Sequence, residues 1–522
     1  MIKYKSINGI GAANLWLKGA LEWNKFITKN PNIEINFDGY DFKVHRMKTI
    51  SFNGYIFPNS RVSFANTDFG DANVSFREIH FECNEISFLN AKFLGEVDFS
   101  RSIFNTDILT FQGATFDKKN IKFIECTFTG NIVNFYRCNF GFGMLSFKNS
   151  CFKQHTLKFS NCIKAAGSIE FQDVKFCVEY IDFSSSNFSI PDEANKSSLN
   201  FTDSTFDVLE ILFNHAKLER RNAIFKRVKL KKGDLVLSNC NFSNSDINLS
   251  NIRISDGDLN LSNSDLNNSR LIAKRSTFSG NVNLSKIKNC HKITEFDLSF
   301  SSFGGSIDLT NNEFNIVPDL CYTKLTNQLP LDSFKFGIKY HNLKAIKLIP
   351  YKKISNPDDI RKIRRLKELA EQNKDFEAAL QLHANELMSK RWTEFNFLKS
   401  ILDMLYSIVS NYGRSIIRPT IALLLSSATL SLFFFTSAIL SNIANSYEDY
   451  NFLKGYGCSI ELVLASSLPF LSPSRDLRTH AIEQLFGGNL PQYYGLSIII
   501  YALFSSICIF LIGLALRNRF RL

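Results

Sequence analysis

The sequence is poor in the residues and motifs on which most enzymes depend. Its 522 residues include only eight histidines, scattered at positions 45, 80, 155, 215, 291, 341, 383 and 480. It contains no Gly-x-x-x-x-Gly-Lys-Ser/Thr, no His-Glu-x-x-His, no Gly-x-Ser-x-Gly and no Gly-x-Gly-x-x-Gly. We therefore expect no enzymatic activity, no catalytic residues, and no cofactor or metal site.

Cysteine pairs are also lacking. None of the eleven cysteines forms a Cys-x-x-Cys motif, and Cys126, Cys138 and Cys162 fall at the small position of a repeat. This pattern indicates small buried thiols in a reducing compartment rather than disulfides or metal ligands.

Phenylalanine, in contrast, is abundant: 51 residues against three tryptophans. Between Phe37 and Phe314 it recurs at steps that alternate between five and seven residues, and leucine or isoleucine partly replaces it later in the chain. Such a short period is typical of a repeat protein whose units bury their apolar faces by stacking on their neighbours. The core ladder predicted from this pattern includes Phe88, Phe93, Phe111, Phe116, Phe123, Phe128, Phe135 and Phe140.

Within each unit, apolar and polar residues alternate, which predicts very short strands with one buried face. The position two before every second phenylalanine is small, as at Ala91, Cys126 and Ser150, so a large ring and a small side chain together fill a narrow interior. With about 24 residues per coil, we predict roughly 11 or 12 coils.

The motifs Phe88-x-x-Ala91-x-Phe93, Phe111-x-x-Ala114-x-Phe116 and Phe123-x-x-Cys126-x-Phe128 resemble tandem pentapeptide repeats. The resemblance implies a β-solenoid in the form of a right-handed quadrilateral β-helix, which we assign to residues 31–316. Because every second unit has two extra residues, we expect coils that are more oblong than square.

The first 30 residues lack the apolar core and cleavage site of a signal peptide. Their apolar residues from Leu15 to Phe26 predict one amphipathic helix of about four turns that ends near Asn30-Pro31. Laid over the first coil, this helix would shield core rings and strand edges. The alternative is a helix that binds a membrane surface through its lysines.

The net charge of +12 lies outside the solenoid, with +4 in residues 1–30 and +8 in residues 319–522. A neutral rod argues against nucleic acid as a partner. A basic linker at 317–357 precedes a helical adaptor at 358–411, with helices at 358–371, 375–391 and about 395–410, the last at the membrane interface. The basic residues that we expect to face anionic headgroups are Lys352, Lys353, Arg361, Arg364 and Arg365. A solvated linker is the alternative.

A membrane domain is predicted at residues 412–522. Its uncharged segments at about 419–443 and 494–516 each exceed the roughly 20 residues needed to cross a bilayer. Arginines precede the first segment and follow the second, so the positive-inside rule places the solenoid and the C-terminus in the cytoplasm. The Asn411-Tyr412-Gly413-Arg414-Ser415 motif and the 513–521 tail resemble the ends of membrane-anchored bacterial pentapeptide-repeat proteins, which implies a multi-pass protein of the bacterial inner membrane.

Residues 459–471 are apolar except for Glu461 and contain Pro469. The segment is too short to span a bilayer and predicts a re-entrant or interfacial helix. Glu461 and Pro469 are therefore the candidate pore residues.

Three functions of different classes fit these features. The first is an inner-membrane scaffold that displays a cytoplasmic solenoid to a protein partner. The second is an oligomeric ion channel or membrane-permeabilising effector formed by the two spans and residues 459–471. A third is lipid or cell-envelope binding at the basic linker. The expected partners are the lipid bilayer, a protein along the solenoid and further copies of the chain.

Overall fold

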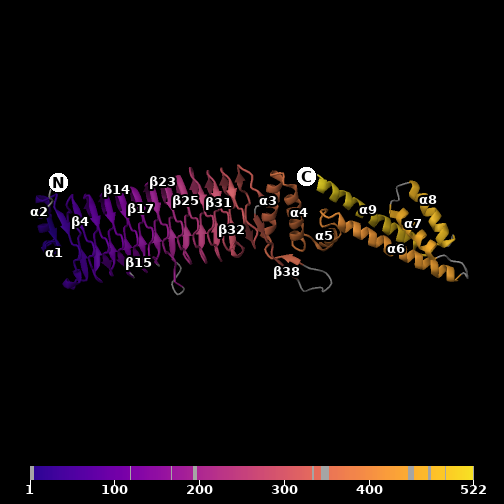
Figure 1. Ribbon diagram of the computed structural model, residues 1–522, viewed down its shortest axis with the longest axis horizontal. Coiled ribbons are helices and arrows are strands. Elements are labelled where there is room, and N and C mark those ends of the chain that lie inside the picture. The colour runs from indigo at the N-terminus through magenta and orange to yellow at the C-terminus, as the bar shows by residue number, and fades with distance from the viewer. Residues whose placement is uncertain are drawn as a thin grey trace. The chain divides into compact units, whose positions relative to one another are not determined.

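In the computed structural model the chain divides into two compact units, residues Met1–Lys339 and Tyr340–Leu522 (Figure 1). The structure describes residues 5–117, 119–165, 167–191, 197–331, 334–342, 352–444, 452–467, 472–487 and 490–520.

The first unit is a parallel β-solenoid of about 13 turns that covers residues 6–336. Pairing partners in successive coils are mostly 23 or 24 residues apart, as in Ile86 with Leu109 and Leu109 with Val133, and the separation reaches 30 residues between Ile169 and Leu199. The predicted solenoid is thus confirmed, and its strands extend past both ends of the 31–316 range. Lys324–Leu325 and Phe334–Phe336, which lie in the predicted linker beyond the phenylalanine period, still pair in parallel with the preceding coil.

Each coil passes in turn through four columns of strands, which is the arrangement expected for a quadrilateral coil. The first column contains β1 (Ser6–Asn8), β2 (Glu34–Asn36), β4 (Arg61–Ser63), β7 (Glu85–Ser87), β11 (Ile108–Thr110), β14 (Thr127–Asn134), β17 (Cys151–Lys158), β21 (Tyr180–Asp182), β23 (Thr205–Leu212), β25 (Lys229–Val236), β28 (Leu259–Asn260), β31 (Val282–Asn283) and β34 (Ile307–Asp308). The second contains β8 (Lys92–Phe93), β12 (Thr115–Phe116), β15 (Asn139–Gly141), β18 (Lys164–Ala165), β35 (Asn312–Phe314) and β37 (Phe334–Phe336), besides isolated bridges.

The third column contains β3 (Thr49–Ser51), β5 (Asn73–Ser75), β9 (Val97–Asp98), β13 (Ile121–Lys122), β16 (Leu145–Ser146), β19 (Ile169–Glu170), β22 (Ser198–Asn200), β24 (Asn222–Ile224), β26 (Asp246–Asn248), β29 (Arg270–Ile272) and β32 (Glu295–Asp297). The fourth contains β6 (His80–Phe81), β10 (Ile103–Asn105), β20 (Lys175–Cys177), β27 (Arg253–Ile254), β30 (Thr277–Phe278), β33 (Ser302–Phe303) and β36 (Lys324–Leu325).

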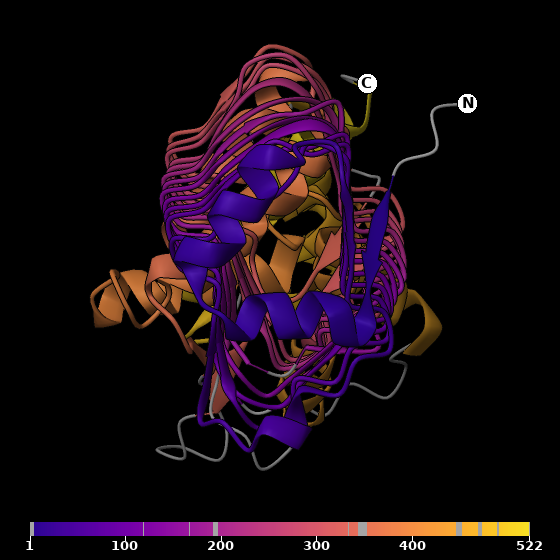
Figure 2. The ribbon, with the colours of Figure 1, turned by 90° about the vertical axis from the view of Figure 1, so that its left-hand side faces the viewer.

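The coil has one long side. In four coils the fourth and first columns join into a single strand of eight residues, which is β14, β17, β23 or β25. Viewed from its N-terminal end, the solenoid has an elongated outline (Figure 2). The two extra residues in every second unit therefore do lengthen the coil, as the spacing predicted.

The interior consists of stacked phenylalanine rings, and all eight residues of the predicted ladder are buried. Phe123 lies 4.8 Å from Phe99 below it and 4.9 Å from Phe147 above it, centroid to centroid, with rings nearly parallel. This distance is the spacing of adjacent strands, so the backbone ladder sets the ring stack. Across the coil Phe123 meets Phe111 edge to face at 5.7 Å, a favourable aromatic geometry.

The small position also forms hydrogen bonds. Ser150 Oγ donates to the carbonyl oxygen of Phe123 in the preceding coil at 2.6 Å and accepts from the amide of Cys126 at 2.9 Å. The thiol of Cys138 donates to the carbonyl oxygen of Phe111 at 3.0 Å in the same way. Serine and cysteine thus fill the corner and also supply polar partners to buried backbone groups.

The N-terminal segment folds as two helices, α1 (Gly9–Leu17) and α2 (Ala20–Lys29), and the prediction of one continuous helix was wrong. The chain bends at Gly19, whose φ of 86° suits glycine and interrupts a helix. The expected shielding of the first coils is present. The indole of Trp23 is fully buried and donates to the carbonyl of Ile56 at 2.7 Å, and the Asn24 amide bonds to Gly54 and Ile56.

The second unit is mainly helical. Its elements are β38 (Tyr340–Asn342), β39 (Lys352–Ile354), α3 (Asp358–Gln372), α4 (Phe376–Lys390), α5 (Phe397–Ser410), α6 (Ile417–Ala444), α7 (Phe452–Ser467), α8 (Ser472–Phe486) and α9 (Tyr494–Phe520). The three predicted adaptor helices and the two long apolar helices correspond to α3, α4, α5, α6 and α9. The sequence predicts one short helix at 459–471, but the structure has two helices in this region. Helix α7 begins seven residues earlier than predicted, and α8 follows it.

Candidate functional site

An exposed aromatic corner lies near the C-terminal end of the solenoid. The rings of Phe300 and Tyr322 stack at 4.7 Å, although 53% and 62% of these residues are exposed, and the guanidinium of Arg275 lies 5.9 Å from the Phe300 ring. All three have a positive φ, as have Asn251 and Asn263 in similar corners. Sequence reasoning missed this corner because it treated phenylalanine as a core residue. The spacing could have revealed it. Phe300 lies two residues after Leu298, an inward-facing position of the repeat, and the residue at that distance is at a corner of the coil.

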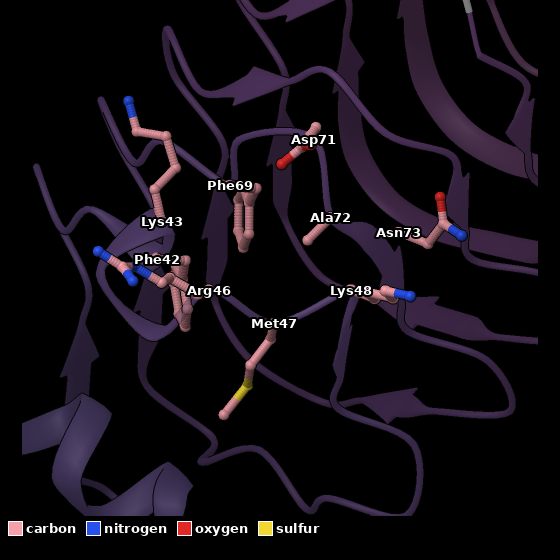
Figure 3. Close-up of a pocket in the computed structure, with 9 residues that line it drawn as sticks. All are labelled: Phe42, Lys43, Arg46, Met47, Lys48, Phe69, Asp71, Ala72 and Asn73. Carbon is pink, nitrogen blue, oxygen red and sulfur yellow. The ribbon is translucent and has the colours of Figure 1, made fainter.

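A cavity of about 460 Å³ lies near the N-terminal end of the solenoid, beside the short 3₁₀ helix η1 (Phe42–His45). Lys43, Arg46 and Lys48 make its wall basic, and the rings of Phe42 and Phe69 form part of its lining. The charged ends of Lys43 and Lys48 point in different directions (Figure 3), and Lys43 binds Asp68 at 2.8 Å. The cationic groups therefore do not converge on one ligand.

Helices α3 and α4 are joined by a cluster of charges around Glu386. Its buried carboxylate accepts hydrogen bonds from Arg364 at 3.0 Å, Lys367 at 2.8 Å and Lys390 at 2.6 Å. Burial raises the pKa of Glu386, but the three cationic hydrogen bonds outweigh that effect and lower the pKa to about 2. Glu386 therefore remains ionised at neutral pH and binds the two helices together.

The five basic residues predicted to face headgroups have different surroundings. Arg364 binds Glu386, and Arg365 binds Glu368 at 3.2 Å. Arg361 is exposed on α3. Lys352 is exposed and Lys353 half-buried on β39, which pairs antiparallel with β38.

A buried polar network connects the adaptor to the first apolar helix. Arg391, after α4, donates to Asp403 of α5 at 2.7 Å, to the hydroxyl of Tyr412 at 2.7 Å and to Ser407 at 2.9 Å. Burial is the main reason why the pKa of Tyr412 lies far above its usual value. An arginine, a carboxylate and a phenol thus fix α5 against the chain that enters α6.

The two motifs at the ends of the predicted membrane domain meet in space. The Asn518 side-chain amide near the end of α9 donates to the carbonyl of Gly413 at 3.1 Å, just before α6. Gly413 has a φ of 73°, and a Cβ there would lie 2.9 Å from a Leu514 methyl group. Glycine is therefore required both by the turn and by the close approach of α9.

Helices α6 and α9 are long and apolar enough to cross a membrane. In their most apolar windows only 17% of residues in α6 and 33% in α9 are buried, so they do not resemble the core helices of a soluble domain. Leu424, Leu432, Leu503 and Phe510 are each more than half exposed. Arg418 lies in the first turn of α6, and Arg517 and Arg519 lie in the last turn of α9.

Helix α7 packs against α6 and α9 through serine residues. The hydroxyls of Ser431 and Ser459 are 2.9 Å apart, and Ser505 Oγ donates to the carbonyl oxygen of Ser467 at 3.0 Å. Ser505 is the middle residue of the uncharged segment 494–516, so the end of α7 lies at the midpoint of α9. Small polar side chains that hydrogen-bond between helices are typical of packing in membranes.

Of the two candidate pore residues, the structure describes one. Glu461 is half-buried on α7, two turns before Ser467. Pro469 lies outside the described residues. Helix α8, which sequence reasoning missed, places Ala481, Leu485 and Phe486 in an apolar cluster with residues of α6, α7 and α9, and its closest neighbour is α7. Its signal was the apolar series from Leu477 to Phe486 at helical spacing.

Among the described residues, no group of three or more His, Cys, Asp or Glu side chains is arranged to hold a metal ion. Comparison with models of protein families, with curated proteins and with solved structures finds no match.

Proposed function

We propose that this chain is a membrane-anchored scaffold of the bacterial inner membrane, which displays its β-solenoid in the cytoplasm to a protein partner. The observation that carries the proposal is the largely uncovered apolar surface of α6 and α9, with arginine at the start of α6 and the end of α9. Apolar helices of this length that the chain does not bury are stable in lipid, and flanking arginine favours the cytoplasmic side.

Membrane integration is tested by expressing the full chain in a bacterium and washing the isolated membranes with alkaline carbonate. Retention in the membrane and release by detergent are the expected results. A chain that carbonate releases into the supernatant would remove the anchoring proposal.

A docking role is supported by the aromatic corner of the solenoid. Exposed stacked rings beside an arginine are the side chains most enriched in protein interfaces. Asparagine tolerates a positive φ, so the double variant Phe300→Asn/Tyr322→Asn should keep the corner folded while removing the rings. Cross-linking in cells should lose a partner band with this variant. The matched control is His215→Asn, an exposed corner with a φ of 60°. Equal cross-linking of both variants would argue against this corner.

A second function, an oligomeric ion channel or membrane-permeabilising effector, is favoured by one observation: α7 ends at the midpoint of α9. A short helix that enters from one side and stops halfway is a common element of pores. The test is conductance of planar bilayers that contain the purified chain, with Glu461→Gln as the variant. An absence of conductance in the unmodified chain would eliminate this function.

A further inference from the structure

The outward face of α8 carries an unbroken polar stripe, made up of Arg475, Asp476, Thr479, His480, Glu483 and Gln484. All six are exposed, whereas the opposite face of α8 is buried. Among the described residues, the one side-chain hydrogen bond in the stripe runs from Thr479 to the carbonyl oxygen of Arg475 within the same helix. The stripe is therefore without a cover from the rest of the chain that the structure describes.

Contacts at both ends of the α7–α8 pair place α8 at the level of the N-terminal half of α9, which is the outer half in the proposed orientation. Ser467, at the end of α7, is bonded to Ser505 in the middle of the uncharged segment, and α8 begins five residues after Ser467. At the other end of α8, the ring of Phe486 lies 6.3 Å from that of Tyr494, where α9 begins. Asp476 is ten residues before Phe486, which is about 15 Å along a helix. If α9 crosses the bilayer, Arg475 and Asp476 lie deep within it.

Charged side chains at that depth are expensive when they face lipid, and in membrane proteins they almost always face protein or a water-filled space. In the described chain none of α6, α7 and α9 covers the stripe, because α8 turns its buried face towards the cluster that these helices form. No described element of the chain therefore supplies the cover that this depth requires.

We propose that the stripe is covered by the same stripe of a second copy, paired antiparallel about a two-fold axis that passes near Thr479 and His480. The charge pattern is self-complementary: Arg475 and Glu483 lie at opposite ends, eight residues apart. An antiparallel pair places Arg475 of each copy opposite Glu483 of the other, and two-fold symmetry makes each such contact twice. The inference rests on the proposed membrane anchoring and adds an interface within the outer half of the bilayer.

The test measures self-association of the full-length protein in lipid nanodiscs or mild detergent by light scattering over a range of concentrations. Arg475→Glu alone and Glu483→Arg alone each bring like charges together and should raise the dimer dissociation constant about tenfold or more. The double variant Arg475→Glu/Glu483→Arg restores opposite charges and should recover association to within about threefold of the unmodified chain. Recovery in the double variant also excludes misfolding as the cause of the single effects.

The control is Lys374→Glu, a charge reversal at an exposed position in the turn between α3 and α4, which should leave association unchanged. A monomeric unmodified chain, or single variants that associate as tightly as it does, would overturn the proposal. Carbonate extraction of the same membranes separates the two possible failures. A chain released by carbonate contradicts the anchoring itself, whereas a chain that stays in the membrane but is insensitive to charge reversal contradicts only the pairing.

Discussion

Single side chains in the solenoid have two separate roles, filling the interior and providing polar partners to the backbone at the corners. Phe123 represents the first role and Ser150 the second, and they belong to adjacent coils joined by a hydrogen bond of 2.6 Å. Because coils repeat, a change at one position tests a rule that applies along the whole unit.

Truncation of a stacked ring should be costly. Phe123→Ala removes a fully buried ring between two others and should lower local stability by about 3–5 kcal/mol. Hydrogen exchange of β13 and its neighbouring strands, followed by mass spectrometry in increasing denaturant, measures the loss.

The control is the adjacent residue. Lys122 is half-buried and forms an ion pair with Glu96, so it is less exposed than the alternation of the sequence suggests. Lys122→Gln should still cost less than about 1 kcal/mol, because partly exposed ion pairs contribute little. Similar losses at both positions would contradict the assignment of inward and outward faces.

At the small position, substitutions of Ser150 can separate the stabilising effect of its hydrogen bonds from the effect of its side-chain volume. Ser150→Ala should cost about 1–3 kcal/mol, because it removes partners from a buried amide and carbonyl. Ser150→Cys should cost less, since Cys126 makes the equivalent bond, to the carbonyl oxygen of Phe99, at the same corner of the preceding coil. Hydrogen exchange again measures the stability of each variant. If Ser150→Cys is less stable than Ser150→Ala, the volume of the side chain and not its hydrogen bonds determines the stability of this corner.

Among the helices, the α3–α4 pair depends on a single ionised carboxylate. The folded pKa of Glu386 lies below its unfolded value, so its stabilisation is complete above about pH 4.3. It is lost as the pH falls through the folded pKa of about 2. Thermal unfolding in detergent, followed by circular dichroism, should show a lower midpoint for Glu386→Gln at pH 7. The difference from the unmodified chain should shrink towards pH 2, and a difference that does not depend on pH would contradict the role of the charge.

Helix α5 combines two faces that require different surroundings. Asp403 faces the protein and binds Arg391, while Leu398, Leu402 and Ile408 are each more than half exposed on the other side. An amphipathic helix directly before a proposed membrane span is suited to lie in the headgroup region, which is the position that the sequence predicts for it.

The position of α5 is measured by tryptophan fluorescence in proteoliposomes. Leu405→Trp lies on the exposed apolar face and should be quenched by brominated lipids and protected from iodide. The control, Gln381→Trp on the exposed side of α4, should show the reverse. After subtraction of the native tryptophan signal, iodide quenching of both variants to the same degree would exclude an interfacial position.

At the scale of the whole molecule, the proposed anchoring by α6 and α9 predicts that the solenoid and the C-terminus lie on one side of the membrane and that the α7–α8 pair enters from the other. A membrane-impermeant maleimide added to intact spheroplasts should therefore label Leu453→Cys, whose residue is 87% exposed at the start of α7. It should label Lys374→Cys and the exposed native Cys177 only after permeabilisation. Labelling of Lys374→Cys in intact spheroplasts would reverse the orientation.

The sequence alone determined the solenoid, because its information is local and repeated. A period of five and seven residues fixes which side chains face inward, and each coil is stacked on the next by the same rule. The lengths and composition of α6 and α9 are equally local properties. The interruption between α1 and α2 was missed because the apolar pattern continues across Gly19, and only its backbone conformation ends the first helix.

Only the tertiary structure decided which residues act together in the second unit. Arg391 and Asp403, Asn518 and Gly413, and Ser467 and Ser505 are far enough apart in the chain that no periodicity links them, and their contacts depend on how the helices pack. Arg364 illustrates the same limit: its sequence neighbours suggest a headgroup contact, whereas folding brings it to Glu386. Local spacing encodes which face of an element is apolar, but the partner of each polar group is set by the fold.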